Sequence, residues 1–265
     1  MGWFSNKIGI EDLKHGDHIY TRRHGYSYSH HGIYEGDGNV IHLTRGPGSN
    51  IGFSSFPSHP SEGPVVSCSL QEFLSGGDLY IFEYGVNALF FLIKRSGTCT
   101  RAYSDPPEQV LYRASFLLAD GFGDYDLSNN NCEDFAFYCK TELLDLKGSR
   151  KTGTSGQIAS FVAAITTIFA YIVMPYGCLP TSFTGLPLMF CFFYCNSRLH
   201  FDAGSRTSYI LEKVPVENFN QLSYSEHEYW MESGRKWIPM LALSALIVCM
   251  HHLVLDSRDD NSSMA

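Results

Sequence analysis

The chain has 265 residues, of which 44% are hydrophobic and 14% are aromatic. This composition excludes wholesale disorder, and the length allows one large domain or one domain with an appendage. The net charge of −8 argues against a nucleic-acid partner, because nucleic-acid binders neutralise phosphates with Lys and Arg.

Residues 1–146 have the pattern of a compact α+β domain. A first strand ends at Ile19-Tyr20, and two apolar runs at 29–35 and 40–44 flank a Gly-Asp-Gly-Asn turn, which predicts a β-hairpin. A Gly- and Pro-rich surface loop is expected at 45–64. The remaining elements predicted for this domain are a helix at 70–74, strands at 79–84, 88–94 and 98–103, and helices at 107–119 and 132–146.

The composition changes after a small, polar linker at 147–156. Residues 157–255 are predicted to be a hydrophobic, mainly helical region, and 256–265 a polar tail. Three apolar segments (157–174, 186–195 and 237–255) fall short of, or just reach, the roughly 20 residues that span a bilayer. Two interpretations stay open: helices buried in the protein, or a hairpin that lies in or on a membrane.

The N-terminus and the cysteines indicate the compartment. The first residues contain no apolar secretory core, and Glu11 and Asp12 interrupt them. The eight cysteines show no regular spacing and no CxxC pair. We therefore expect an intracellular, cytoplasmic protein with mostly free thiols rather than a secreted one.

Cys132 begins a predicted helix. Asn129, Asn130 and Asn131 precede it, and one of them is a natural N-cap. Unpaired N–H groups and the positive dipole end of a helix favour a thiolate, so Cys132 is a candidate nucleophile with a pKa below the usual thiol value of about 8.5. The alternative is that Cys132 is a small core residue, since free cysteines are often buried.

The histidines of the predicted hairpin are candidate partners for this thiol. Side chains alternate along a strand, so His30 and Gly32 share one face and His31 lies on the other. A two-residue turn would place His42 on the face of His31, whereas a three-residue loop would place it opposite Gly32 and diagonal to His30. The residues alone leave both turns open.

The segment HHGIYEGDGNVIHL, with NNNCEDFA about ninety residues later, resembles the lecithin:retinol acyltransferase-like (LRAT) domain, and especially its plant branch of NC-domain proteins. The resemblance covers roughly residues 10–146. It implies an antiparallel sheet with packed helices, a permuted papain-like and NlpC-like core in which the histidine strands precede the cysteine helix. The family positions fall on His30, His42 and Cys132, and this match selects the three-residue loop.

The resemblance also implies an activity. A cysteine-dependent acyltransferase or hydrolase would act on an ester or amide, with Cys132 as nucleophile, His30 as base and His42 orienting His30. Tyr28 matches a family position near the acyl group, and Asn131 supports the nucleophile. The apolar region favours a lipid or acyl substrate and membrane association. No metal-ligand spacing is evident, so neither a metal nor another cofactor is expected.

Two other hypotheses stay open. The fold could serve as a catalytically silent scaffold or a lipid- or protein-binding module, because a fold does not fix function. A cysteine peptidase is the other alternative, because the same residues cleave amides. The chain departs from the family pattern at Asp134, where His is common.

Overall fold

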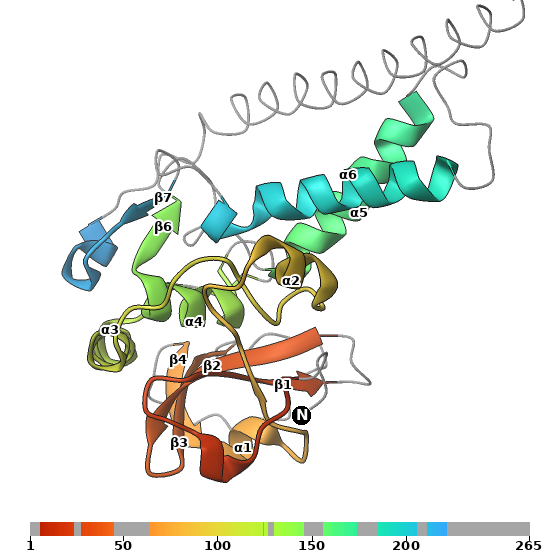
Figure 1. Cartoon of the computed structure of the whole chain (residues 1–265). Helices are drawn as coiled ribbons and strands as arrows, with labels where there is room; N and C mark the ends of the chain where they lie inside the picture. The colour runs from red at the N-terminus through yellow and green to blue at the C-terminus, as the bar shows by residue number, and fades with distance from the viewer. Residues whose placement is uncertain are drawn as a thin grey trace, which may run out of the picture. The chain divides into compact units, whose positions relative to one another are not determined.

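The computed structural model of the chain describes residues 6–23, 28–44, 64–123, 125–126, 130–145, 156–173, 185–205 and 211–221 (Figure 1). Two compact units divide the chain: residues 1–159 with 199–224 form the first, and residues 160–198 with 225–265 form the second. Most of the predicted surface loop and linker, the apolar segment at 237–255 and the polar tail lie outside the described residues.

A five-stranded antiparallel sheet with the order β4-β3-β2-β1-β5 forms the centre of the first unit. Its strands are β1 (His18–Arg23), β2 (Tyr28–Gly36), β3 (Asn39–Leu43), β4 (Val65–Ser69) and β5 (Tyr80–Ile81). A separate antiparallel pair consists of β6 (Leu143–Asp145) and β7 (Leu211–Lys213). The predicted α+β class with an antiparallel sheet is confirmed.

The first two α-helices lie on either side of β5 in the sequence, and the other α-helices follow it. The α-helices are α1 (Leu70–Leu74), α2 (Ala88–Ile93), α3 (Pro107–Asp120), α4 (Cys132–Thr141), α5 (Gly156–Val173) and α6 (Gly185–Phe201). Short 3₁₀ turns are η1 (Ile10–Asp12), η4 (Ala203–Ser205) and η5 (Val216–Gln221). Helices α5 and α6 coincide with the first two predicted apolar segments. Neither they nor any other described helix is long and apolar enough to cross a membrane.

The β2–β3 hairpin has the register expected for a three-residue loop, but it contains a two-residue turn and a β-bulge. Its turn has two residues, Asp37 and Gly38, both at positive φ (49° and 78°). Ile33 lies opposite Ile41, but Gly36 lies opposite Asn39, so one extra residue bulges from β2. The bulge shifts the register by one, as the three-residue loop would have done. Continued along the strands, it puts Gly32 opposite His42.

Three predicted elements differ from the structure. Instead of the predicted strand at 88–94, residues 88–93 form helix α2, because the Asn87 side chain accepts a hydrogen bond from the Phe90 N–H (2.9 Å) and caps the helix. Residues 98–103 make only an isolated bridge, between Cys99 and Glu83, among the described strands. Helix α4 ends at Thr141 instead of residue 146, because the left-handed Glu142 (φ 61°) turns the chain into β6.

The two faces of the sheet carry different helices (Figure 1). On one face, Ile33 and Ile41 belong to the main core, together with side chains of α3 and α4 such as Phe135. On the other face, Val40 packs with Phe73 of α1. Alternation along β2 and β3 therefore sends neighbouring residues to different helices.

The segment at 211–221, which follows α5 and α6 in the sequence, belongs to this main core. Val214, Val216 and Phe219 are buried in it. The Phe219 ring stacks on Phe122 with a centroid distance of 4.8 Å, and the Tyr138 hydroxyl donates to the Val214 carbonyl (2.8 Å). The structure thus places part of the predicted region 157–255 in the first unit.

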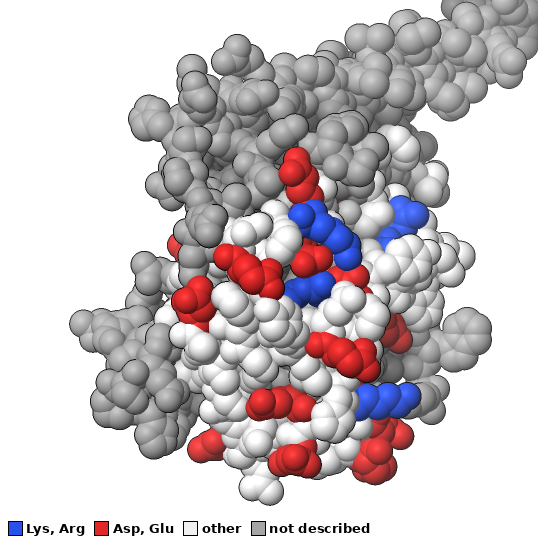
Figure 2. All heavy atoms as spheres, turned by 90° about the vertical axis from the view of Figure 1, so that its left-hand side faces the viewer, with Lys and Arg blue, Asp and Glu red and all other residues white. Residues whose placement is uncertain are grey.

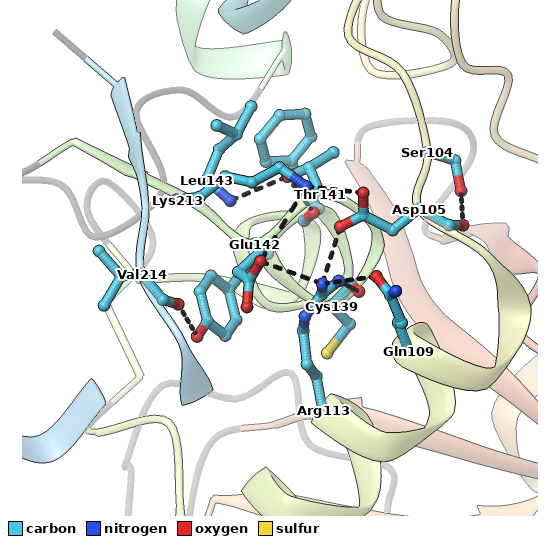
Figure 3. Close-up of polar contacts among 12 residues, drawn as sticks. Ser104, Asp105, Gln109, Arg113, Cys139, Thr141, Glu142, Leu143, Lys213 and Val214 are labelled. Carbon is cyan, nitrogen blue, oxygen red and sulfur yellow. Dashed lines mark hydrogen bonds and ion pairs between the residues drawn. The ribbon is translucent and has the colours of Figure 1, made fainter. Parts of the chain in front are cut away.

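A buried guanidinium ties this returning segment to the helices (Figure 3). Arg113 of α3 lies 2.8 Å from an Asp105 oxygen and 3.3 Å from a Glu142 oxygen, and it donates to the Cys139 carbonyl (2.9 Å). Lys213 of β7 completes the cluster, with its Nζ 2.7 Å from Asp105. The Arg113 side chain is only 5% exposed, while Lys213 is 54% exposed. Loss of Arg113 should therefore lower the free energy of unfolding more than loss of Lys213.

Replacing Arg113 with Ala should lower the free energy of unfolding by about 3–5 kcal/mol, because it strands two carboxylates and a carbonyl without their buried cation. Lys213→Ala is the matched control and should cost at most about 1 kcal/mol, since its ion pair is exposed to solvent. Urea unfolding of the full chain measures both values. Equal losses in the two variants would contradict this assignment.

Candidate functional site

Cys132 is the first residue of α4, and Asn131 is the N-cap. The Asn131 side chain accepts hydrogen bonds from the backbone N–H groups of Glu133 (2.9 Å) and Asp134 (3.1 Å). The Asp134 carboxylate accepts the Asn131 N–H in return (3.1 Å), which closes a capping box. The prediction that an asparagine caps the cysteine helix is correct. Asp134, where the family often has His, serves the cap.

His30 and His42 form a hydrogen-bonded pair. Their Nε2 and Nδ1 atoms lie 3.0 Å apart, on adjacent strands and on one face of the sheet. Both rings pack on Phe73 of α1, with centroid distances of 5.2 and 5.6 Å. The structure thus brings together the two predicted histidines, on the face that α1 covers.

Cys132 lies against the backbone of β2. Helix α4 packs with Ile33, which alternates with His30 along the strand. The Cys132 sulfur lies 3.9 Å from the Ser29 carbonyl oxygen, and among the described residues no hydrogen bond joins it to His30. The expected contact between the thiol and the base is therefore absent from this structure. The sulfur lies instead against the backbone of the strand that carries His30.

A different thiol bonds to the histidine pair. The Cys68 sulfur of β4 lies 3.2 Å from Nε2 of His42, whose Nδ1 faces His30. The three side chains form one chain of hydrogen bonds, Cys68–His42–His30. Sequence reasoning missed Cys68. The alternation of side chains along β4 indicates which face Cys68 occupies, because Val65 packs in the main core and Cys68 packs on the α1 face. The residue of β3 that Cys68 approaches could not be predicted, because the register of β4 against β3 is set across the long segment before Pro64.

His31, next to His30, enters a second buried chain on the face of Ile33. Its Nδ1 lies 2.9 Å from His18 Nε2, and His18 Nδ1 lies 2.7 Å from the Tyr84 hydroxyl. The His31 ring also stacks on Tyr20 (5.3 Å). The adjacent histidines of the motif therefore serve separate networks on opposite faces.

Burial dominates the acid–base properties of both thiols. Burial raises the pKa of Cys132 to about 12, and the charges of Glu133 and Asp134 add to this effect, whereas the His31 backbone N–H opposes it. Burial and the Glu72 charge raise the pKa of Cys68 to about 11. The expected low thiol pKa at the helix N-terminus is not found for Cys132, because desolvation outweighs the helix dipole.

The histidines are held neutral by the same cause. Burial lowers the pKa of His31 to about 3 and that of His42 to about 4, the latter helped by the nearby Arg23 cation. The pKa of His30 is also well below its usual value, through burial and then the charges of His42 and Arg23. At neutral pH these imidazoles are therefore unprotonated.

Tyr28, the last predicted site residue, begins β2 and pairs with Arg23 of β1. No group of His, Cys, Asp or Glu within the described ranges could hold a metal ion. The expectations that the protein has no cofactor and no nucleic-acid partner remain predictions. Figure 2 shows Asp and Glu side chains spread over one face of the described surface, with fewer Lys and Arg among them.

The geometry is that of a histidine hairpin followed by a cysteine helix, and comparison with known proteins identifies its family. The lecithin retinol acyltransferase family profile matches residues 11–145, and the chain belongs to this family. It is 46% identical over 242 residues to Protein LEAD-SENSITIVE 1 of Arabidopsis thaliana, covering 83% of this chain and 91% of that protein. The LRAT-like domain predicted from the motifs is confirmed, and the similarity to a plant protein agrees with the predicted plant branch.

The buried histidines predict how stability depends on pH. His18, His30, His31 and His42 are at most 7% exposed, and the pKa of each is lowered in the folded state. Below pH 6.5 the unfolded chain binds more protons than the folded chain, so the free energy of unfolding falls as the pH falls towards the folded pKa values. The full stability is present only above pH 6.5.

Each imidazole should contribute a slope of up to about 1.4 kcal/mol per pH unit between pH 6 and 4. Urea unfolding at several pH values measures the slope. His42→Gln should make it shallower, while His15→Gln should leave it unchanged because His15 is exposed. A stability that is flat between pH 7 and 4.5 would show that these histidines titrate in the folded protein as they do in the unfolded chain.

Proposed function

We propose that the chain is a cysteine-dependent acyltransferase or hydrolase that acts on an ester or amide of a lipid, with Cys132 as the nucleophile. The observation that carries the proposal is the His30–His42 pair, 3.0 Å apart at the two family positions, with His30 on the strand against which the Cys132 sulfur lies. The confirmed LRAT family supports the acyl chemistry at the level of the family.

The reaction begins with a change of contact at Cys132. In the resting protein its sulfur faces the Ser29 carbonyl, so attack requires the thiol to reach the His30 imidazole. Such catalytic contacts often form only with substrate bound. His30 would then take the thiol proton as sulfur attacks the carbonyl carbon, and return the proton to the leaving group.

The other groups of the site prepare this step. His42 holds the His30 ring through the hydrogen bond to its Nε2, the orienting role of a third triad member. The low pKa values of both imidazoles keep them unprotonated, and the high pKa of Cys132 keeps its proton until attack. The chemistry is therefore general-base catalysis by a neutral pair rather than attack by a preformed thiolate.

Activity of the full chain tests the proposal. Phosphatidylcholine vesicles are the substrate, and released fatty acid and covalent acyl-enzyme are measured by mass spectrometry. Cys132→Ser should abolish the acyl-enzyme, and His30→Gln should slow turnover by about 10²–10⁴-fold, the usual range for a lost general base. Cys191→Ser, which removes an exposed thiol, is the matched control and should not change the rate.

Turnover that survives Cys132→Ser would remove Cys132 as the nucleophile. No acyl-enzyme with vesicles or with soluble ester substrates, in a folded protein, would favour the silent scaffold instead. Cleavage of amide bonds in peptides at a higher rate than of lipid esters would favour the peptidase.

We also propose that α5 binds the surface of a lipid bilayer. Its exposed apolar side chains recur at helical spacing along one face: Phe161, Ile165, Ile168, Phe169 and Ile172. Residues 156–173 contain no charged side chain. A contiguous exposed apolar face of this kind is typical of surfaces that bind a membrane.

Flotation with phosphatidylcholine vesicles tests this surface. Replacing Phe161, Ile165 and Phe169 together with Ser should reduce the vesicle-bound fraction at least about tenfold, because each buried apolar side chain contributes about 1.5–3 kcal/mol. Leu89→Ser, at an equally exposed apolar residue of α2, should leave flotation unchanged. Unchanged flotation of the triple variant, or no flotation of the natural chain, would refute the proposal.

A further inference from the structure

Cys68 has the surroundings of a reactive thiol that the proposed mechanism does not use. It is partly exposed, whereas Cys132 is buried. Its sulfur is 3.2 Å from His42 Nε2, and His42 Nδ1 is 3.0 Å from His30 Nε2. The thiol thus stands at the accessible end of a chain of two imidazoles.

Local structure fixes the position of this thiol. Strand β4 ends at Ser69, which caps α1 through a capping box with Glu72. Cys68, one residue earlier, packs on the α1 face of the sheet, where His42 also lies. Both elements that bear the contact, β3 and β4, are paired along five residues, so the thiol and imidazole are held by backbone hydrogen bonds.

A cation borders the same three side chains. Arg23 of β1 donates hydrogen bonds to the carbonyls of Phe73 (2.5 Å) and Leu74 (3.2 Å), which anchors its guanidinium near α1. Its charge lowers the pKa values of Cys68, His42 and His30. The Phe73 backbone N–H also lowers the pKa of Cys68, while burial and Glu72 raise it. The net pKa of Cys68 is raised to about 11, so the thiol keeps its proton at rest and depends on the neighbouring His42 to remove it during attack.

One tautomer of the histidine pair suits attack by Cys68. In it the Cys68 S–H donates to His42 Nε2, and His42 carries its proton on Nδ1 and donates to His30 Nε2. His30 then carries its own proton on Nδ1, so the opposite tautomer, in which His30 Nε2 donates to His42 Nδ1, is the one that leaves His30 Nδ1 unprotonated as the base for Cys132. The two thiols would therefore use alternative tautomers of the same pair.

We propose that Cys68 is a second nucleophilic thiol, which uses His42 as its base and His30 as the positioning residue, and which accepts acyl groups from acyl thioesters. Because the three side chains are in contact already, this site needs no rearrangement, unlike the contact between Cys132 and His30.

The step is a thioester exchange. As the Cys68 sulfur attacks the carbonyl carbon, its proton passes to His42 Nε2, and the new carbon–sulfur bond gives a tetrahedral intermediate. The bond to the departing sulfur then breaks, and His42 returns the proton to that thiolate. The products are acyl-Cys68 and a free thiol, with no oxidant or reductant required.

The experiment uses the full chain with S-butyryl-N-acetylcysteamine as the acyl donor, and peptide mapping measures the rate at each cysteine. Cys191 is the internal comparison, since it is more exposed than Cys68 and its polar contact is with Cys195 (3.9 Å) rather than with a histidine. If exposure alone decides, Cys191 reacts faster. If the imidazole chain acts, we expect Cys68 to react at least about tenfold faster and His42→Gln to slow Cys68 alone by about 10²-fold.

A pH series separates activation from general damage to the fold. A thiol that reacts only as its preformed thiolate slows about tenfold per pH unit between pH 8 and 6. Cys68 should hold its rate, because a neutral imidazole takes its proton throughout this range. The ratio of the Cys68 rates at pH 8 and pH 6 is measured on the natural chain, so this test remains valid even if His42→Gln unfolds the protein. Circular dichroism of that variant tells the two cases apart.

The result also distinguishes the two thiols. Butyryl on Cys68 that persists in Cys132→Ser supports the inference, whatever becomes of the lipid activity. Butyryl on Cys132 alone overturns it and leaves the proposed function intact. Equal or faster labelling of Cys191, with both rates falling together with pH, overturns it as well.

Discussion

One extra residue in β2 decides which histidines meet. The bulge before Gly36 shifts the register of β2 against β3, and a shift by one moves every later side chain to the other face. Without it, His42 would share the face of His31, which already belongs to the buried contacts with His18 and Tyr84. With it, His42 meets His30 under α1. The two adjacent histidines can therefore serve separate networks without competing for one partner.

Desolvation then sets the chemistry on each side. A buried imidazole loses its charge more readily than an exposed one, and a buried thiol keeps its proton. The pKa of His42 falls to about 4, while the pKa values of Cys68 and Cys132 rise to about 11 and 12. An ion pair of thiolate and imidazolium is therefore disfavoured at rest, and the proton must move during attack. The distance from sulfur to nitrogen then matters more than the resting pKa, and this distance separates Cys68 from Cys132.

Local signals predicted much of this arrangement. The Asn131 cap is encoded within three residues, and the hairpin by its turn sequence. The same logic failed at 88–93, because a short apolar run is compatible with a strand or a helix and only the Asn87 cap favours the helix. The two turns that the residues left open were separated only by resemblance to a family. The structure keeps the register that the resemblance selected but builds it from a two-residue turn and a bulge.

Contacts between distant segments could not be predicted in this way. Cys68 meets His42 only because β4 pairs with β3 across a Gly- and Pro-rich stretch, and no periodicity encodes that register. The choice of face by α4 has the same origin. Its apolar stripe shows that it is buried, but not which side of β2 it covers. The sequence thus names the residues of the site, whereas the packing of α1 and α4 decides which of them touch.

The same long-range packing brings together, within the first unit, the chain segments that flank the apolar helices. Strands β6 and β7 pair with Asp145 opposite Leu211, so the excursion that contains α5 and α6 leaves and re-enters the unit at adjacent residues. Beyond β7, Phe219 completes the core against Phe122, and Lys213 joins the cluster around Arg113 (Figure 3). A helical appendage on a single linker could be lost without harm to the domain before it. Here the chain after the helices supplies core side chains, so the domain defined by the family match is incomplete without the segment at 211–221.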